Sequence, residues 1–539
     1  MRGFFALLSR SSHQPRQGKT RVVNKRRNHI SIRPLSATGG RKHLTSAVPA
    51  HAQAWARPNS TGLPVALGLA LTLVVSSCQS YEAKPLDFEA YRQSWHTRQI
   101  DRDSLLQSLE EPLAAQLPAE FDPSDGLQLA EGRVLARFFH PDMRIARLQV
   151  QRALVGADNA GAWNDPVLNI GALNIDSSAS DPWFLSLGLQ FELPLSGRLD
   201  AERAEAEAMR VAAVRELQEV EWHVWHELQR AWLAWSSAGV RLEESQASLA
   251  DLQGLADWAS SLAEQGELPR TEAALFRIEV GRRRMATSEL QQEQHELEQA
   301  ALAAMGLASE AELRLVPTFA IPGSSVNEGS AQLEGRKAFD AIATSNPSLV
   351  HLKQEYELAE KALQLEILAQ LPSLALGPAY EQESGESRIG LLAGLPLPMW
   401  NANRHGIAEA RVDRELARVR LEVAYEKLSG QWVRLTRKIE SLAARREALE
   451  VEWMPIVTSQ LEDARQLLRI GEGSSMVLLE SLTRAQDTAV ALIELRSASA
   501  LAIADLAHLI GPQQNIAPAS ADAPMSEPKT EPLTKEVQP

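Results

Sequence analysis

Two halves of this chain of 539 residues repeat the same short landmarks at a nearly constant spacing. The four pairs of landmarks, 205 or 206 positions apart, are His140-Pro141 and Asn346-Pro347, Asp165-Pro166 and Leu371-Pro372, Gly266-Glu267 and Gly471-Glu472, and Met305-Gly306 and Ile510-Gly511. Chance is a poor explanation for four matches in one order, so the pattern indicates a tandem duplication. The duplication is the strongest constraint on the fold, because both halves must adopt one arrangement.

Each half predicts the same order of elements: a helix, two short strands, a very long helix, a glycine turn and a returning helix. In the first half these elements are residues 130–158, 166–175, 183–193, 199–264 and 269–305. In the second half the strands are predicted at 373–381 and 388–397, the long helix at 403–470 and the returning helix at 476–510. Pro455 predicts a kink in that second long helix.

The first long helix carries a coiled-coil pattern and would be about 99 Å long at 1.5 Å per residue. From Leu217 to Ala263, apolar residues recur at alternating steps of three and four, and Ser245 is the one interruption. A sustained period of 3.5 residues is typical of a helix that packs along a partner helix. Three tryptophans widen the apolar stripe, so we expect more than one neighbour; they are Trp222, Trp225 and Trp232.

The strand at residues 183–193 alternates between an apolar and a mostly small or polar face. Its apolar face carries Trp183, Leu185, Leu187, Leu189, Phe191 and Leu193. A strand of about 11 residues is long enough to cross a membrane at a tilt. Four strands cannot close a barrel, and lipid does not tolerate open sheet edges, so a membrane location would require several chains. The alternative is a soluble four-stranded sheet with half-buried strands.

The first 77 residues have the character of an export signal. They contain 12 Lys/Arg and no Asp or Glu, and an apolar run at 63–75 precedes Ser76, Ser77 and Cys78. A run of 13 residues is too short for a transmembrane helix, but a basic flank and small residues suit a cleaved signal. The end resembles the lipobox of bacterial lipoproteins, which implies lipidation of Cys78; the alternative is an ordinary signal peptide with an incidental cysteine. Residues 78–125 are then expected to form an extended linker, and 512–539 a disordered tail.

Composition excludes several functional classes. The net charge is −14, which argues against nucleic acid as a partner. A single cysteine excludes a disulfide framework and cysteine-based metal clusters. No phosphate-binding loop, nucleophile elbow or catalytic carboxylate pair is present, so we predict neither enzyme activity nor a cofactor. Glu219, His223 and His226 have a spacing that could hold a metal, but the tryptophans beside them favour packing, and no metal site is predicted.

The duplicated order of elements resembles the TolC-like outer-membrane efflux family. The motifs that carry the resemblance are His140-Pro141 before the strands, Leu193-Pro194-Leu195 and Leu395-Pro396-Leu397 after them, and the glycine turns at 263–268 and 467–473. Each motif alone is weak, but their order, repeated at a fixed offset across residues 125–512, is specific.

The resemblance implies a mainly α fold with a small β part, built from two repeats at 126–320 and 321–511 with long antiparallel coiled-coil hairpins. Four strands per chain would contribute to a trimeric 12-stranded transmembrane β-barrel, continued by a periplasmic α-barrel. The protein would be a lipid-anchored homotrimer in the outer membrane, and substrates would reach it from an inner-membrane pump through a periplasmic adaptor. The alternative is a lipid-anchored periplasmic coiled-coil scaffold or pump adaptor that does not span the membrane. The cargo, whether drug, metal ion or protein, stays open.

The resemblance also implies roles for residues near the two glycine turns. Adaptor docking falls on the hairpin tips, at Gly266, Glu267, Leu268, Gly471, Glu472, Gly473 and Ser474. The alternative is that these residues only cap the helices. Acidic residues of the family's closed aperture align with Glu272 and Glu480, and a further one with Val477; a solvated helix face is the alternative for Glu480. The tyrosine and arginine that latch the family's gate align with Leu468 and Gly473, so the latch is absent here or built differently.

Overall fold

The structure, a computed structural model, describes most of the chain between residues 81 and 512. The described residues are 81–98, 121–174, 183–311, 313–319, 335–383, 386–470 and 472–512, with the single positions 100, 103 and 105. The signal region, Cys78, Gly471 and residues 513–539 lie outside them. The chain divides into two units, Met1–Pro85 and Leu86–Pro539, and all elements discussed below belong to the second.

The second unit contains the predicted series of elements twice. The first series is α5 (Leu129–Phe139), α6 (Pro141–Asn159), β1 (Val167–Asn174), β2 (Trp183–Leu193), α7 (Arg198–Gln265) and α8 (Arg270–Ala304). The second is α9 (Gly335–Ser345), α10 (Pro347–Leu368), β3 (Leu374–Glu383), β4 (Glu386–Gly394), α11 (Arg404–Glu447), η2 (Ala448–Trp453), α12 (Met454–Arg469) and α13 (Ser475–Ile510). The mainly helical fold with a small sheet is therefore confirmed.

The prediction of one continuous helix at 130–158 is wrong, because the chain breaks at His140. Pro141 lacks a backbone N–H and disfavours helical backbone at the residue before it. His140 instead caps α6, and its ring Nδ1 accepts a hydrogen bond of 3.3 Å from the Asp142 N–H. Asn346 does the same for α10, with its side-chain oxygen 3.0 Å from the Ser348 nitrogen. The repeated landmark before each proline is therefore a helix cap.

The extended linker predicted at 78–125 also contains a helix. α2 (Phe88–His96) begins at Asp87, whose carboxylate accepts a hydrogen bond of 2.9 Å from the Ala90 N–H. Further along, Leu105 and Phe121 are buried in the same apolar cluster as Trp232 of α7. This segment therefore departs from an extended form at α2 and contributes side chains to the core.

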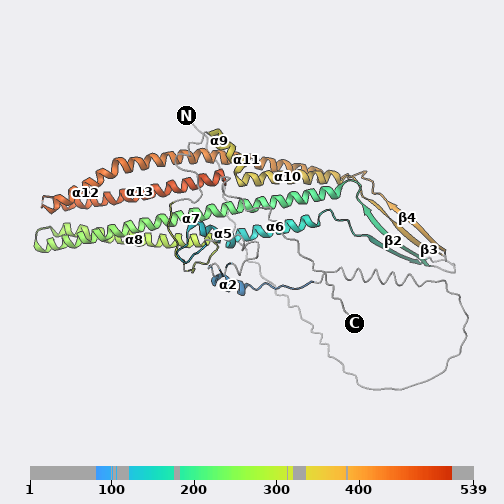
Figure 1. The fold of residues 1–539 in the computed structure, drawn as a ribbon, viewed down its shortest axis with the longest axis horizontal. Coiled ribbons are helices and arrows are strands. Elements are labelled where there is room, and N and C mark those ends of the chain that lie inside the picture. Colours follow the sequence, from blue (N-terminus) through green and yellow to red (C-terminus); the bar gives the residue numbers. More distant parts are fainter. Residues whose placement is uncertain are drawn as a thin grey trace, which may run out of the picture. The chain divides into compact units, whose positions relative to one another are not determined.

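The long helix α7 runs through the middle of the unit and contacts helices of both repeats (Figure 1). Its 68 residues span about 102 Å at 1.5 Å per residue. It packs against α5, α6 and α8 of its own repeat and against α10 and α13 of the other. Trp225 and Trp232 are buried, which confirms that the tryptophans widen its contact surface. Ser245, the interruption in the apolar pattern, is buried too, and its hydroxyl lies 2.7 Å from that of Thr287 on α8.

The second long helix is interrupted near the predicted kink at Pro455. A π-helical turn, η2, separates α11 from α12 and ends two residues before this proline. Proline offers no N–H and its ring collides with the carbonyl one turn earlier, so a widened turn accommodates it within an otherwise continuous rod.

The glycine that ends each repeat lies against the backbone just before the proline that begins α6 or α10. Gly306, after α8, has φ +74°, and a Cβ built there would lie 2.4 Å from the Phe139 carbonyl oxygen. Gly511, after α13, has φ +96°, and a Cβ there would lie 2.3 Å from the Ser345 carbonyl oxygen. Both positions therefore require glycine for space and for backbone conformation, which gives the duplication a physical basis.

Replacing Gly306 with alanine will destabilise the fold. Strain at a left-handed position costs about 1–3 kcal/mol, and the collision with the Phe139 carbonyl adds to it. We expect Gly306→Ala to lower the midpoint of thermal unfolding, followed by circular dichroism. Gly281→Ala on α8 is the matched control, because nothing lies within 4 Å of its Cβ position; it should be neutral or slightly stabilising. Equal midpoints for the two variants would contradict this account.

Candidate functional site

The four strands form a single antiparallel sheet in the order β1-β2-β3-β4. The two inner strands each have two neighbours, whereas β1 and β4 have a strand partner on one side only among the described residues. The sheet therefore presents a row of unpaired backbone groups along each outer edge. Figure 1 shows the strands at one end of the unit, extending beyond the ends of α7 and α10.

The strand register gives the sheet one apolar face and one face that is mostly small or polar. Residues paired directly across strands lie on the same face, and one such row is Ile170, Leu187, Tyr380 and Ile389. The neighbouring row, on the opposite face, is Asn169, Gly188, Ala379 and Gly390. The next row on this second face is Gly171, Ser186, Glu381 and Arg388. The alternation predicted for β2 thus extends across all four strands.

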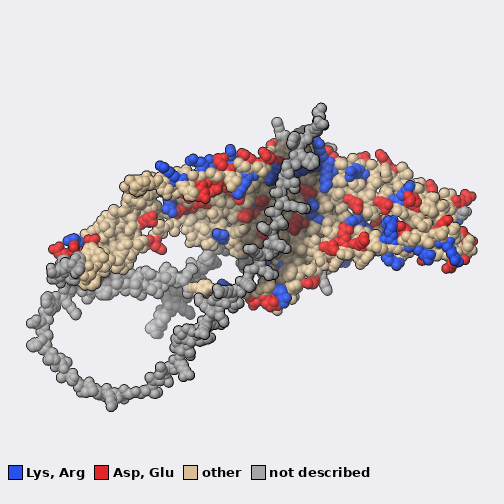
Figure 2. Space-filling model, turned by 180° about the vertical axis from the view of Figure 1, so that it is seen from behind, with Lys and Arg blue, Asp and Glu red and all other residues tan. Residues whose placement is uncertain are grey.

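The apolar face of the sheet is exposed in the single chain. Ile170 is 75% exposed and Ile389 is 86% exposed, and Leu187 between them is 43% exposed. Water-soluble monomers rarely expose a continuous apolar patch of this kind, which marks a surface that meets lipid or another chain. Figure 2 shows a mostly uncharged surface over this end and mixed charges over the helices. Among the described residues, no helix is both long and apolar enough to cross a bilayer.

The first hairpin tip lies between α7 and α8, at the end of α7 remote from the sheet (Figure 1). Gly266 ends α7 in the left-handed conformation with φ +81°. The Glu267 N–H then donates a hydrogen bond of 2.9 Å to the Leu262 carbonyl, which closes the turn. Of the residues predicted to dock an adaptor, Gly266 and Glu267 are exposed. Leu268 is half-buried and packs against an apolar cluster inside the tip.

The second tip joins α12 to α13 with similar geometry over the residues described. The Glu472 N–H donates to the Leu467 carbonyl at 3.1 Å, and Ser474 is the residue immediately before α13. A Cβ built on Gly473 would lie 2.5 Å from the Leu468 nitrogen, so the turn passes too close to α12 for a side chain. Glu472 and Ser474 are exposed, and they lie beside Gly473. Of the predicted docking residues of this tip, Glu472, Gly473 and Ser474 thus lie together, and Gly471 lies outside the described residues.

The two tips are held together within one chain. An apolar cluster joins the hairpins, with Leu252, Ala256, Ala259, Ala273, Phe276 and Leu482 at its centre. Beside it, the buried Ser475 hydroxyl donates a hydrogen bond to the Glu272 carboxylate. Glu272, predicted at the aperture, is therefore engaged by the other hairpin of its own chain. Glu480 is exposed and pairs with Arg484 one turn along α13, at 2.9 Å.

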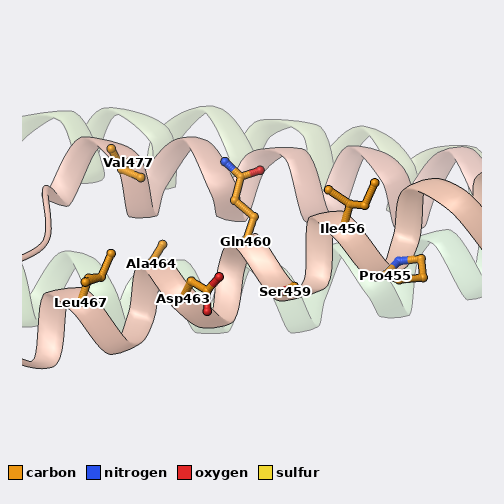
Figure 3. Close-up of a pocket in the computed structure, with 8 residues that line it drawn as sticks. All are labelled: Pro455, Ile456, Ser459, Gln460, Asp463, Ala464, Leu467 and Val477. Atoms are coloured by element: carbon orange, nitrogen blue, oxygen red, sulfur yellow. The ribbon is translucent and has the colours of Figure 1, made fainter.

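A groove that the sequence analysis missed follows the second hairpin. It has a volume of about 590 Å³, and its lining is Pro455, Ile456, Ser459, Gln460, Asp463, Ala464, Leu467 and Val477. Figure 3 shows these side chains along α12, with Val477 facing them from α13. Ile456, Leu467 and Val477 are all exposed. The signal was present in the sequence, because the lining residues of α12 recur every three or four positions, but Pro455 was interpreted only as a kink.

The histidines considered as metal ligands make other contacts. Glu219 accepts a hydrogen bond from His351 of α10, with 2.6 Å between the Glu219 carboxylate and His351 Nδ1. His226 lies 3.3 Å from Asp505 of α13. Over the described part of the chain, no group of three or more His, Cys, Asp or Glu side chains has a metal-binding arrangement.

Removing the hydrogen bond between the tips will loosen them. A hydrogen bond to a charged group is worth about 1.5–3 kcal/mol, which corresponds to about a tenfold or greater change in local opening. We expect Ser475→Ala to increase the rate of tryptic cleavage at Arg270 and Arg469, both exposed at the tips. Ser474→Ala is the matched control, because the Ser474 side chain makes no capping hydrogen bond. Cleavage of both variants at the parent rate would show that the bond does not hold the tips.

Comparison with known proteins supports the fold described above. No family model and no curated protein sequence matches the chain. Among solved structures, CusC, described in terms of folding and transmembrane channel formation, aligns with a TM-score of 0.60 at 16% identity over 72% of this chain and 92% of its own. The outer-membrane channel OprN gives 0.60 at 14% identity over 75% and 96%. The Campylobacter jejuni CmeC outer membrane channel gives 0.60 at 14% identity over 81% and 94%. The chain therefore has the TolC-like fold of these outer-membrane channels.

Proposed function

We propose that the protein is an outer-membrane channel that assembles as a homotrimer and serves as a passive conduit. The observation that carries this proposal is the sheet, which combines one exposed apolar face with two edges that have no strand partner in the described part of the chain. The likeness in fold to the OprN and CmeC outer-membrane channels supports it. A conduit requires no catalytic group, in agreement with the lack of catalytic motifs in the sequence.

Closure of the sheet follows from the cost of unpaired backbone in lipid. Each unsatisfied N–H or C=O group there costs several kcal/mol, so only a sheet closed on itself can span a bilayer. Three copies of the four-stranded sheet supply twelve strands, an even number within the usual range for bacterial barrels. The face with Ile170, Leu187 and Ile389 then meets lipid. The face with Gly188 and Gly390 lines a water-filled lumen.

The long helices would extend from this barrel into the periplasm. At about 102 Å, α7 carries the tips far from the sheet. The exposed groove on α12 and α13 is a surface that neighbouring subunits of a helical barrel would cover. A lipid on Cys78 would tether the chain to the same membrane. A periplasmic scaffold that does not span the membrane is less well supported, because it leaves the apolar face of the sheet without a partner.

The tips are the proposed contact with a periplasmic adaptor, which would connect the channel to an inner-membrane pump in a tripartite efflux or secretion system. Their exposed residues are Gly266, Glu267, Glu472 and Ser474. Tight turns held by backbone hydrogen bonds offer a partner a surface of fixed shape. The cargo is unassigned, because the residues at the tips distinguish neither drugs, metals nor proteins.

Two adjacent positions on β4 test which face meets lipid. Arginine on the lipid face of a barrel costs about 2–4 kcal/mol at mid-membrane, whereas lumen positions tolerate charge. We expect Ile389→Arg to reduce strongly the heat-resistant trimer recovered from outer membranes. Gly390→Arg, one residue away on the opposite face with open space around its Cβ position, should retain the trimer and shift single-channel selectivity towards anions. Equal recovery of both variants, or loss of Gly390→Arg alone, would contradict the proposed orientation.

Glu480 tests the aperture. Three symmetry-related carboxylates in a pore attract cations and repel anions, so Glu480→Gln should lower the cation-to-anion permeability ratio measured in planar bilayers. Glu462→Gln is the matched control, since Glu462 is an exposed carboxylate on α12 of the same hairpin. If both variants keep the parent ratio, Glu480 belongs to a solvated helix face and not to the aperture.

A further inference from the structure

Four histidines lie where the two repeats contact each other, between the sheet and the tips. His223 and His226 are on α7, His351 is on α10, and His508 is in the last turn of α13. α7 belongs to the first hairpin and α13 to the second, so this contact couples the two hairpins. The function proposed above does not use these residues.

The His508 ring is held against three other rings. It stacks on His226 with 4.1 Å between ring centroids and 11° between planes. His223 lies 4.9 Å away and Trp222 lies 5.8 Å away, both also from α7. The Trp222 indole N–H donates a hydrogen bond of 2.8 Å to the His508 carbonyl, which fixes this turn of α13 against α7.

Polar support for a positive charge at His508 is poor. The Nδ1 atoms of His508 and His226 are both buried without a hydrogen-bond partner among the described residues. The Asp505 carboxylate lies 3.3 Å from His226 and also accepts a hydrogen bond from Arg230. Two stacked imidazoles cannot both carry a proton without strong repulsion. Stacking on Trp222 offsets only part of this cost.

Electrostatics gives the same result. The pKa of His508 is lowered to about 3, mainly by burial and also by His226 and His223, against a smaller opposing effect of Asp505 and Glu219. The apolar clusters at this end of α13 include Phe339 and Ala341 of α9 and Trp432 and Leu435 of α11. Between about pH 6.5 and pH 3, His508 therefore stays neutral in the folded state, whereas the unfolded chain takes up a proton at this residue.

The adjoining contact, between α7 and α10, responds in the opposite sense. His351 of α10 bonds to Glu219 of α7 and lies 3.8 Å from Glu355. The hydrogen bond to Glu219 raises the pKa of His351, and Glu355 and Glu216 also raise it. In turn, hydrogen bonds from His223 and His351 hold the pKa of Glu219 below its usual range, against the effect of its burial. This contact is thus an ion pair that acid favours.

The two contacts have opposite linkage to pH. Because the pKa of His508 is depressed in the folded state, the contact of α7 with α13 loses stability as pH falls from about 6.5 towards 3. Because the pKa of His351 is raised, its stabilising effect is fully present below about 6.5 and is lost only at higher pH. The stabilisation that Glu219 contributes to the contact of α7 with α10 declines only below about pH 4.5, where Glu219 of the unfolded chain takes up a proton.

We propose that this histidine cluster is an acid-sensitive hinge, at which mild acid loosens the α7–α13 contact while the α7–α10 contact holds. Release of the last turns of α13 frees the second hairpin relative to the first. The effect on transport rests on the proposed channel function, whereas the loosening itself does not.

Hydrogen exchange of the full chain in detergent tests the hinge directly. Peptides covering residues 500–510 and 347–356 are followed at pH 7.5 and pH 5.0, and the rates are corrected for intrinsic exchange. Each pH unit below 6.5 changes an opening equilibrium linked to one proton by up to about tenfold. We expect protection in 500–510 to fall by about tenfold or more at pH 5.0, and protection in 347–356 to be unchanged or higher.

Two neutral replacements identify the group responsible. His508→Gln should abolish the change in 500–510, whereas His295→Gln, at an exposed histidine on α8, should retain it. If His508→Gln does not fold, His226→Gln, which removes the stacked neighbour, should reduce the change instead. An equal loss of protection in both peptides, or a response that persists in both cluster variants, would overturn the proposal. Bilayer conductance of the parent distinguishes this failure from that of the channel function, because an exchange response without conductance would refute only the channel.

Discussion

The backbone groups at the two outer edges of the sheet restrict the environments and assemblies in which this chain can be stable. β1 and β4 each leave a row of N–H and C=O groups without a strand partner among the described residues. In water such edges are usually protected by charge, proline or a covering element, and in lipid they must be closed. The row from Ile170 to Ile389 places apolar side chains on one face between these edges. This combination carries the proposal that the chain is one segment of a larger closed sheet.

The helices are built to hold that segment at a distance from the tips. α7 contacts helices of both repeats along its length, and its buried tryptophans fill the centre of the unit. Gly306 and Gly511 let the end of each returning helix pass against the backbone that precedes the proline at the start of α6 or α10 in its own repeat. The same interlock is thus made twice, which explains why these landmarks share one spacing in the sequence. The histidine cluster lies at the contact between the two repeats of one chain, where a small change in stability affects both hairpins.

Much of the fold could be predicted because the decisive patterns are local. The bounds predicted for β2 match the structure, since alternation with period two and flanking turn residues define a strand. The end of α7 was also predictable, because Gly266 stops the helix. The break at Pro141 could have been inferred from the proline itself, but the apolar pattern on both sides concealed it.

Contacts between distant segments were not predictable from pattern. Glu272 bonds to Ser475, 203 positions later, and no local periodicity links two such residues. The same holds for the stacking of His508 on His226. The groove on α12 and α13 is formed by residues of two helices that follow η2, and the sequence indicates it only through Pro455 and the residues spaced after it. Sequence thus predicted the elements and the tips, and the structure was needed to show which tip residues bind each other.

Disulfide formation between the two outer strands is the most direct test of the account. A disulfide requires Cα atoms within about 7 Å, whereas β1 and β4 of one chain are three strand spacings, about 14 Å, apart. Ile170→Cys combined in turn with a cysteine at each position from Arg388 to Leu392 covers the possible registers, and the parent with Cys78 alone is the control. After oxidation in outer membranes, the account predicts covalently linked trimers on a denaturing gel for at least one pair. Exclusively monomeric chains for every pair would contradict closure by three copies.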